Sequence, residues 1–128
     1  MKRATRIYVG IAILLFALLL YYSYSYAINS QYRISPNEAK LRLKRKEIDV
    51  IIDVRTDLER VTLGYYPNSV HIQMTDLERE MSRKIPKKST RILVYCNTGQ
   101  RARMATEKLH ALGYKNSVYI ATSYMSLY

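Results

Sequence analysis

The only cysteine of the chain, Cys96, lies at a position that favours chemistry. An apolar run over 92–95 precedes it and a helical pattern follows Arg101, which predicts that a strand passes into a helix at the cysteine. The first N–H groups of a helix have no partners within the helix, and the helix dipole adds partial positive charge, so both favour an anion. Gly99 allows a tight turn in which successive N–H groups converge on one atom. The pattern therefore predicts a thiolate, the reactive form of cysteine.

The alternative interpretation is structural, because a free cysteine is among the most buried residue types and often behaves as a small hydrophobic side chain. The order of strand, cysteine, glycine-containing loop, arginine and helix favours the reactive interpretation. A single cysteine excludes an internal disulfide. The two histidines, His71 and His110, are widely spaced from each other and from Cys96, so we expect no metal and no other cofactor.

Three motifs resemble, in the same order, those of rhodanese-like sulfurtransferase domains. The first is Asp53-Val54-Arg55, the second is Gly64-Tyr65-Tyr66-Pro67-Asn68-Ser69-Val70-His71-Ile72, and the third is Cys96-Asn97-Thr98-Gly99-Gln100-Arg101. They are similar to the family's Asp-Val-Arg at the end of its first core strand, to its Gly-His-Ile-Pro-Gly-Ala segment and to its Cys-X-X-Gly-X-Arg active-site loop. The resemblance covers roughly residues 34–120.

The resemblance implies that Cys96 is a nucleophile that takes sulfur from a small anionic donor such as thiosulfate or a persulfide. The cysteine would become a persulfide and pass the sulfur to a thiol or cyanide acceptor. The anion- and substrate-binding loop would consist of Asn97, Thr98, Gly99, Gln100 and Arg101. Asp53 and Arg55 would mainly support this loop.

Two other functions compete with sulfur transfer. A cysteine-dependent phosphatase also holds an anion between cysteine and arginine, but it places five residues between them, whereas four separate Cys96 from Arg101. The smaller ring fits a sulfur atom better than a tetrahedral phosphate. The stronger rival is a catalytically idle rhodanese-like scaffold or binding module in a larger membrane assembly, which thirteen tyrosines in a basic chain would suit. The intact loop favours sulfur transfer.

The chain also departs from the family pattern. One extra residue lies between Glu59 and Gly64, and Tyr65 stands in place of the common histidine. The family usually continues past its last strand with a Gly-Gly pair and a helix, whereas 121–128 reads Ala-Thr-Ser-Tyr-Met-Ser-Leu-Tyr. We therefore expect an atypical, short C-terminal end that lacks the family's closing element for one wall of the pocket.

The N-terminal segment is apolar and carries no charge between Arg6 and Arg33. Residues 7–28 are long enough for a membrane anchor, which needs about 20 residues, and tyrosines favour the membrane interface. A cleavable signal peptide is the alternative, with Ser25-Tyr26-Ala27 as its cleavage site. We favour the anchor and divide the chain into an anchor with its basic flank (1–28), a tether (29–34) and the rhodanese-like domain (35–128).

The formal charge of +11 favours anionic partners. A basic cluster is formed by Lys40, Arg42, Lys44, Arg45 and Lys46. This cluster is either a solvated helix face or a contact with anionic lipid beside the anchor. No recognised nucleic-acid-binding motif accompanies the charge. Three basic residues before the apolar run place the N-terminus in the cytoplasm and the domain across the membrane.

Short β-branched or apolar runs alternate with helical patterns after the anchor. The runs predict strands over 48–54, 70–72, 92–95 and 118–120. Helices are predicted from Ser35-Pro36 to about Lys46, from a capping box at Thr75-Asp76-Leu77-Glu78, and from Arg101 to a left-handed C-cap at Gly113. The alternation predicts an α/β domain with a small parallel sheet flanked by helices, in which ligands bind at the carboxyl ends of the strands.

Overall fold

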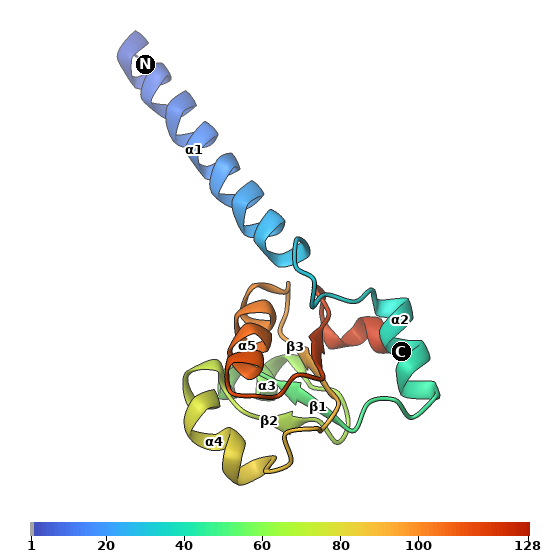
Figure 1. Cartoon of the computed structure of the whole chain (residues 1–128). Helices are drawn as coiled ribbons and strands as arrows, with labels where there is room; N and C mark the ends of the chain where they lie inside the picture. The colour runs from blue at the N-terminus through green and yellow to red at the C-terminus, as the bar shows by residue number, and fades with distance from the viewer. Residues whose placement is uncertain (1) are drawn as a thin grey trace.

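The alternating runs and helical patterns form a small sheet with helices around it in the structure, a computed structural model that describes residues 2–128 (Figure 1). The helices are α1 (Arg3–Ile28), α2 (Pro36–Lys44), α3 (Asp57–Leu63), α4 (Leu77–Lys84) and α5 (Gln100–Ala111). Two short 3-10 helices are η1 (Met74–Asp76) and η2 (Tyr124–Leu127). The strands are β1 (Val50–Asp53), β2 (Val70–His71), β3 (Ile92–Tyr95) and β4 (Ser117–Tyr119).

The sheet is parallel throughout, with the strand order β2-β1-β3-β4, so the predicted α/β class is confirmed. The central strands β1 and β3 are in register from Val50 opposite Ile92 to Asp53 opposite Tyr95. Because all four strands run the same way, their carboxyl ends meet at one edge, and the loop that follows β3 begins there.

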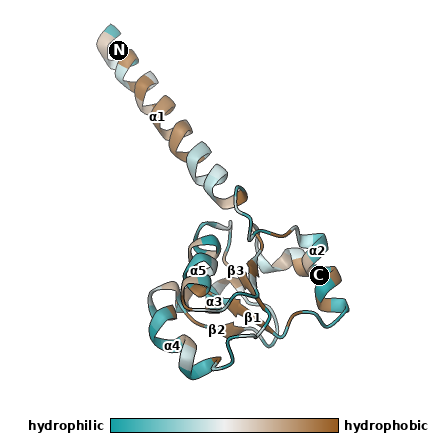
Figure 2. Ribbon diagram, in the orientation of Figure 1, coloured by the Kyte–Doolittle hydropathy of each residue, from teal (hydrophilic) through white to brown (hydrophobic). Residues whose placement is uncertain are grey.

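Both faces of the sheet are buried. On one face Ile52 and Val94 pack with Leu77 and Met81 of α4 and with the apolar side of α5. On the other face Leu93 packs with α2 and η2. Burial on both faces explains why the central strands β1 and β3 are short, nearly continuous apolar runs without alternation, as Figure 2 shows by their hydrophobic colour.

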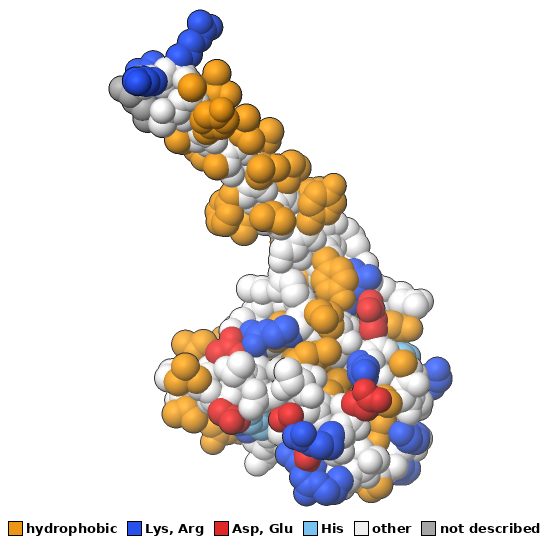
Figure 3. All heavy atoms as spheres, turned by 90° about the vertical axis from the view of Figure 1, so that its left-hand side faces the viewer, with side chains coloured by type: hydrophobic (Ala, Val, Ile, Leu, Met, Phe, Trp, Pro, Cys, Tyr) orange, Lys and Arg blue, Asp and Glu red, His pale blue; other side chains and the backbone are white. Residues whose placement is uncertain are grey.

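Helix α1 projects from the domain as a single rod (Figure 1). Within the described residues it is the one helix long and apolar enough to cross a membrane, and a signal sequence has the same character. Figure 3 shows hydrophobic side chains along most of its surface and cationic side chains at its free end. Its last turn is different, because Ala27 is buried against the domain.

Residues 29–34, predicted as a tether, run alongside the outer edge of β4. The Tyr119 N–H donates to the Tyr32 carbonyl at 3.0 Å, and the Ile34 N–H donates to the Tyr119 carbonyl at 2.9 Å. Arg33 and Tyr119 thus form a parallel bridge. These bonds hold the chain between α1 and α2 against the sheet.

The predicted capping box at Thr75 and Glu78 is wrong. Thr75 lies inside η1, and α4 begins at Leu77 without a side-chain cap. A capping box forms instead at the start of α3, a helix that the sequence patterns did not predict. There Thr56 accepts from the Glu59 N–H while the Glu59 carboxylate accepts from the Thr56 N–H. The box matters because it orients Glu59.

The short C-terminal end, where the sequence lacks the expected closing element, forms η2 and covers one side of the sheet. Leu127 is buried in the core against α2, and the Tyr124 hydroxyl donates to the Leu63 carbonyl at 3.1 Å. The Tyr124 ring also lies 5.8 Å from that of Tyr95, between ring centres. A single 3-10 turn therefore covers this side of the sheet because its aromatic and aliphatic side chains reach the core.

Candidate active site

Cys96 lies between the end of β3 and the start of α5, as predicted, and its side chain is buried. Its sulfur accepts two backbone N–H groups, from Gly99 at 3.1 Å and from Ala102 at 3.4 Å. Both donors belong to the loop and the first turn of α5, where N–H groups have no partner within the helix. The loop is therefore built to stabilise negative charge on sulfur.

Gly99 is required by both its backbone angle and its surroundings. Its φ is +108°, a conformation that side-chain-bearing residues rarely adopt. A Cβ atom at this position would lie 2.7 Å from the Cα of Ala121 and 3.2 Å from the Cβ of Ala27. The segment after β4 and the last turn of α1 therefore both pack closely against the loop at Gly99.

Arg101 forms a forked ion pair with Glu59 of α3. Its Nη1 donates to Oε2 at 2.7 Å and its Nη2 donates to Oε1 at 2.8 Å. Hydrogen bonds from Arg101, followed by those from Thr56, lower the pKa of Glu59 to about 2. The guanidinium predicted to bind the donor is thus anchored by a carboxylate at the edge of the loop.

Asn97 connects this ion pair to the buried interior. Its Nδ2 donates to Oε1 of Glu59 at 3.0 Å, while its Oδ1 accepts from Nη1 of Arg55 at 3.4 Å. Residues from β1, α3 and the loop are therefore joined by one chain of polar contacts. We expect the loop to be rigid, because Glu59, Asn97 and Arg55 each have their orientation set by at least two partners.

Asp53 and Arg55 form the buried end of the chain. Arg55 donates to the two carboxylate oxygens at 2.9 and 2.8 Å and to the Gly64 carbonyl at 2.7 Å. Tyr95 and Arg60 also donate to Asp53, at 3.0 and 3.1 Å. Burial by itself raises the pKa of Asp53, but the hydrogen bonds from Arg55 outweigh it and hold the pKa below its usual value.

The outer side of the loop faces α1. Thr98 is exposed, and its hydroxyl contacts the Gln100 side-chain carbonyl. Gln100 in turn donates through Nε2 to the hydroxyl of Ser23 at 2.9 Å. The structure thus brings all the sequence-predicted site residues into one contiguous group. Sequence reasoning missed Glu59 as a site residue, although Thr56 and Glu59 have the spacing of a capping box.

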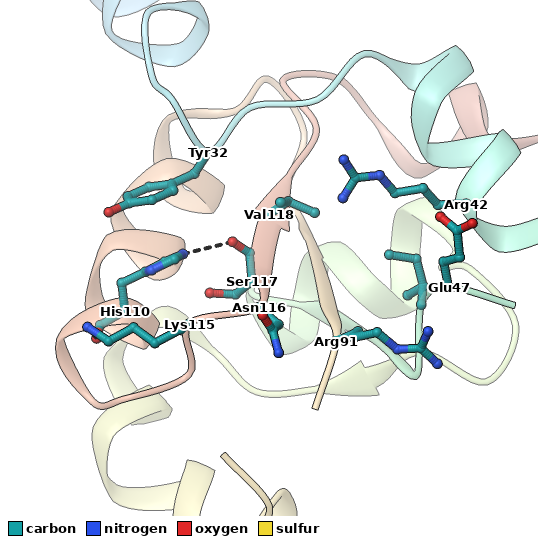
Figure 4. Close-up of a pocket in the computed structure, with 10 residues that line it drawn as sticks. Tyr32, Arg42, Glu47, Arg91, His110, Lys115, Asn116, Ser117 and Val118 are labelled. Atoms are coloured by element: carbon teal, nitrogen blue, oxygen red, sulfur yellow. Dashed lines mark hydrogen bonds between the residues drawn. The ribbon is translucent and has the colours of Figure 1, made fainter. Parts of the chain in front are cut away.

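The described residues contain no group that could hold a metal ion. A cavity of about 570 Å³ lies away from the loop, at the amino end of β3 and β4 (Figure 4). Arg91 and His110 are among the residues that line it. Arg91 is already paired with Asp49 at 2.7 Å, and His110 donates through Nε2 to the Ser117 carbonyl at 2.9 Å. The chemistry-bearing residues therefore gather at the other end of the sheet, around Cys96.

Comparisons with known proteins find relatives in sequence and in fold. The chain is 28% identical over 95 residues to the adenylyltransferase and sulfurtransferase UBA4 of Candida albicans, a match that covers 70% of this chain and 22% of that protein. The human single-domain sulfurtransferase TSTD1 has a similar structure, with a TM-score of 0.64 and 22% identity, covering 76% of this chain and 95% of that one. A rhodanese-like domain protein from Staphylococcus aureus has a TM-score of 0.65 and 26% identity, covering 77% and 92%.

The family model of the rhodanese-like domain matches residues 35–126. This range includes β1 with Asp53, the following Arg55, the whole cysteine loop and all of η2 except Leu127. Since the match spans most of the chain, the protein belongs to the rhodanese-like domain family.

Proposed function

We propose that this protein is a membrane-anchored sulfurtransferase that carries sulfane sulfur as a persulfide on Cys96. The observation that carries the proposal is the buried sulfur of Cys96 with two N–H groups directed at it, from Gly99 and Ala102. The names of UBA4 and TSTD1 describe sulfurtransferases, which supports the same type of activity here.

Sulfur loading is a displacement at sulfur. The Cys96 thiolate attacks the outer sulfur of thiosulfate, a new S–S bond forms, and the S–S bond of thiosulfate breaks as sulfite leaves with the electron pair. An acceptor thiolate then attacks the outer sulfur of the persulfide. The outer sulfur moves to the acceptor, and Cys96 leaves as a thiolate ready for another cycle.

The loop residues have distinct roles in this scheme. The N–H groups of Gly99 and Ala102 stabilise negative charge on the Cys96 sulfur. They do so in the free thiolate and again when this sulfur leaves the persulfide during transfer. Arg101 presents positive charge to the anionic donor while Glu59 fixes its orientation. Asn97, Thr98 and Gln100 shape the rim, and the Asp53–Arg55 pair supports the loop from below.

Helix α1 is proposed as an uncleaved anchor through residues 7–28. The signal-peptide alternative places cleavage after Ala27, but that residue is buried and its carbonyl accepts from the Tyr119 hydroxyl. Removing α1 would expose this part of the core. The N-terminus is proposed to be cytoplasmic and the domain to lie across the membrane, with the basic cluster 40–46 beside anionic lipid.

An idle scaffold or binding module is the second candidate function. The observation that favours it is the fork of Arg101, which Glu59 already occupies, above a cysteine that is buried. A scaffold would keep this pair for stability and load no sulfur. Protein partners in a larger membrane assembly belong to this candidate.

The decisive experiment is the intact mass of the full chain in detergent after incubation with thiosulfate, beside a Cys96→Ser variant. We expect the native protein alone to gain one sulfur atom, which cyanide then removes. If neither thiosulfate nor a persulfide donor loads sulfur, and Cys96 resists alkylation near neutral pH, the scaffold function replaces the sulfurtransferase.

A further inference from the structure

The last two turns of α1 form part of the wall around the cysteine loop. Ser23 accepts from Gln100, and Ala27 lies where a Cβ on Gly99 would contact it. Arg103 of α5 donates to the Tyr26 carbonyl at 2.6 Å, and its guanidinium lies 4.0 Å from the centre of the Tyr26 ring. The helix is therefore docked on the carboxyl end of the sheet.

The docking leaves no spacer between the apolar helix and the active site. A membrane span needs about 20 residues, and 20 counted from Ile7, the first residue after Arg6, end at Tyr26. The contact with the loop begins at Ser23, inside that count. Ser23 lies only three residues before Tyr26. At about 1.5 Å per residue, the two positions are about 5 Å apart along the helix.

Three tyrosines of α1 lie close to Ser23, where the helix first contacts the loop. Tyr21, Tyr22 and Tyr24 are all exposed, one turn or less from Ser23. Exposed tyrosines are favoured where the hydrocarbon of a bilayer meets the headgroups, because the ring is apolar and the hydroxyl is polar. The position of these rings and the length of the helix agree on where the bilayer ends.

Helix α3, which carries Glu59, also has exposed apolar side chains. Leu58 and Val61 are 71% and 81% exposed, and they flank Glu59, which binds Arg101 and Asn97 of the loop. An acceptor with an apolar part would gain from burying them.

We infer that the acceptor of the sulfur is a thiol held at the headgroup level of the membrane, which the docked α1 presents to Cys96. The inference rests on the proposed function. In the transfer step the membrane-held thiolate attacks the outer sulfur of the Cys96 persulfide, a new S–S bond forms on the membrane-held molecule, and Cys96 leaves as a thiolate. Docking raises the rate by holding the two sulfur atoms at one depth.

The test uses the full chain in vesicles that carry either a lipid-linked thiol or the same amount of a soluble thiol. Anchoring alone favours the lipid-linked thiol, so the decisive comparison is between the native chain and variants that loosen the docking. Those variants are Tyr26→Ala and Arg103→Ala, which remove the ring contact and the bond to the helix end. Arg79→Ala, an exposed arginine on α4, is the control with the same change in charge.

We expect loosened docking to slow transfer to the lipid-linked thiol by about threefold or more, because a hydrogen bond and a cation–π contact are lost. Transfer to the soluble thiol serves as the reference, so the expected result is a fall in the ratio of lipid-linked to soluble transfer, and urea unfolding checks that the variants fold. The Arg79→Ala control matches the native chain in both assays. Equal transfer to the lipid-linked thiol by native and docking variants would overturn the inference.

A second readout does not depend on sulfur transfer. Because Cys96 is the only cysteine, any alkylation of the chain reports on it. A lipid-linked maleimide should modify the native chain faster than the docking variants, while a soluble maleimide should not distinguish them. Failure to load sulfur with this difference intact would reject the sulfurtransferase, and with it a sulfur acceptor, while the docked access to Cys96 from the membrane would stand. Sulfur loading without the difference would reject only the membrane-held acceptor.

A thiol on a single-span peptide, placed at the same depth, distinguishes the two sources of the acceptor. If the docking variants slow transfer to the lipid-linked thiol but not to the peptide thiol, the acceptor is a small lipid-like molecule. The same dependence for the peptide alone would identify a protein cysteine. Either result supports a thiol at this depth, and dependence for neither overturns it.

Discussion

The two ends of the four-stranded sheet both gather cations and carboxylates, but they do so in different ways. At the carboxyl end, Asp53 and Arg55 are almost fully buried, and each has several partners. At the amino end, Arg91 and Asp49 form one pair whose side chains are 45% and 42% exposed. The geometry of the individual ion pairs is similar, so the difference lies in burial and in the number of shared partners.

This contrast explains why one end of the sheet is suited to chemistry. A buried pair strengthens its neighbours because the local dielectric is low, whereas water screens an exposed pair. The chain of contacts from Asp53 through Arg55 and Asn97 therefore gives the cysteine loop one fixed shape. The cavity at the amino end has charge at its rim but no comparable network (Figure 4).

The largest effect is expected from removing the buried cation. Arg55→Met leaves the Asp53 carboxylate buried without its main partner, which costs about 3–5 kcal/mol of unfolding free energy. Arg91→Met removes the exposed cation and should change stability little. Urea unfolding of the full chain in detergent measures both. Similar losses for the two variants would contradict the contrast between the ends.

Gly99 of the cysteine loop and Gly113 give a second comparison, with a smaller expected loss of stability. Gly99 and Gly113 have similar positive φ values, +108° and +98°. A Cβ on Gly113 meets only the Cδ of Lys88 at 3.7 Å, whereas one on Gly99 would clash with Ala121. Gly99→Ala should therefore destabilise the chain by about 1–3 kcal/mol more than Gly113→Ala.

Sulfur loading separates the two glycine variants further. Gly99→Ala should slow loading from thiosulfate, because the Gly99 N–H that reaches Cys96 would move. Gly113→Ala, at the end of α5, should load normally. Equal melting temperatures and loading rates for the two variants would show that the loop is not tightly packed.

The smallest effect concerns the Glu59–Arg101 pair and its dependence on pH. The pKa of Glu59 is about 2, below its ordinary value, so the pair stabilises the fold above pH about 4.5 and loses this contribution as the pH falls towards 2. Glu59→Gln should lower stability at pH 7 by about 1 kcal/mol, a modest amount because the pair is partly exposed.

The pH profile provides the control for this pair. The stability of Glu59→Gln should approach that of the native chain as the pH falls from about 4.5 towards 2, because the carboxylate of the unfolded chain takes up a proton first and the paired carboxylate of the folded chain does so only near 2. Asp49→Asn at the amino end removes the matched exposed carboxylate and should leave sulfur loading unchanged. If the difference in unfolding free energy between the native chain and Glu59→Gln stays constant from pH 7 to 2, the assigned role of Glu59 is wrong.

Much of the fold followed from local pattern. The strand Ile92–Tyr95, the cysteine after it and the buried face of α5 all appear where the apolar runs predict them. The helix α3 was missed because its Leu58 and Val61 are exposed, so it has no apolar stripe directed at the core. The box predicted at Thr75 failed because the chain forms a 3-10 turn there before α4 begins.

The sequence by itself determined the class of the fold, the place of Cys96 between a strand and a helix, and the apolar character of α1, because neighbouring residues carry each of these patterns. Only the tertiary structure decided that Arg101 binds Glu59, 42 residues away, and that Gln100 binds Ser23, 77 residues away. Such pairs depend on how separate elements pack, and no local periodicity encodes which side chains meet there. The cysteine loop was therefore predictable from sequence, while its rigid support and its contact with α1 were not.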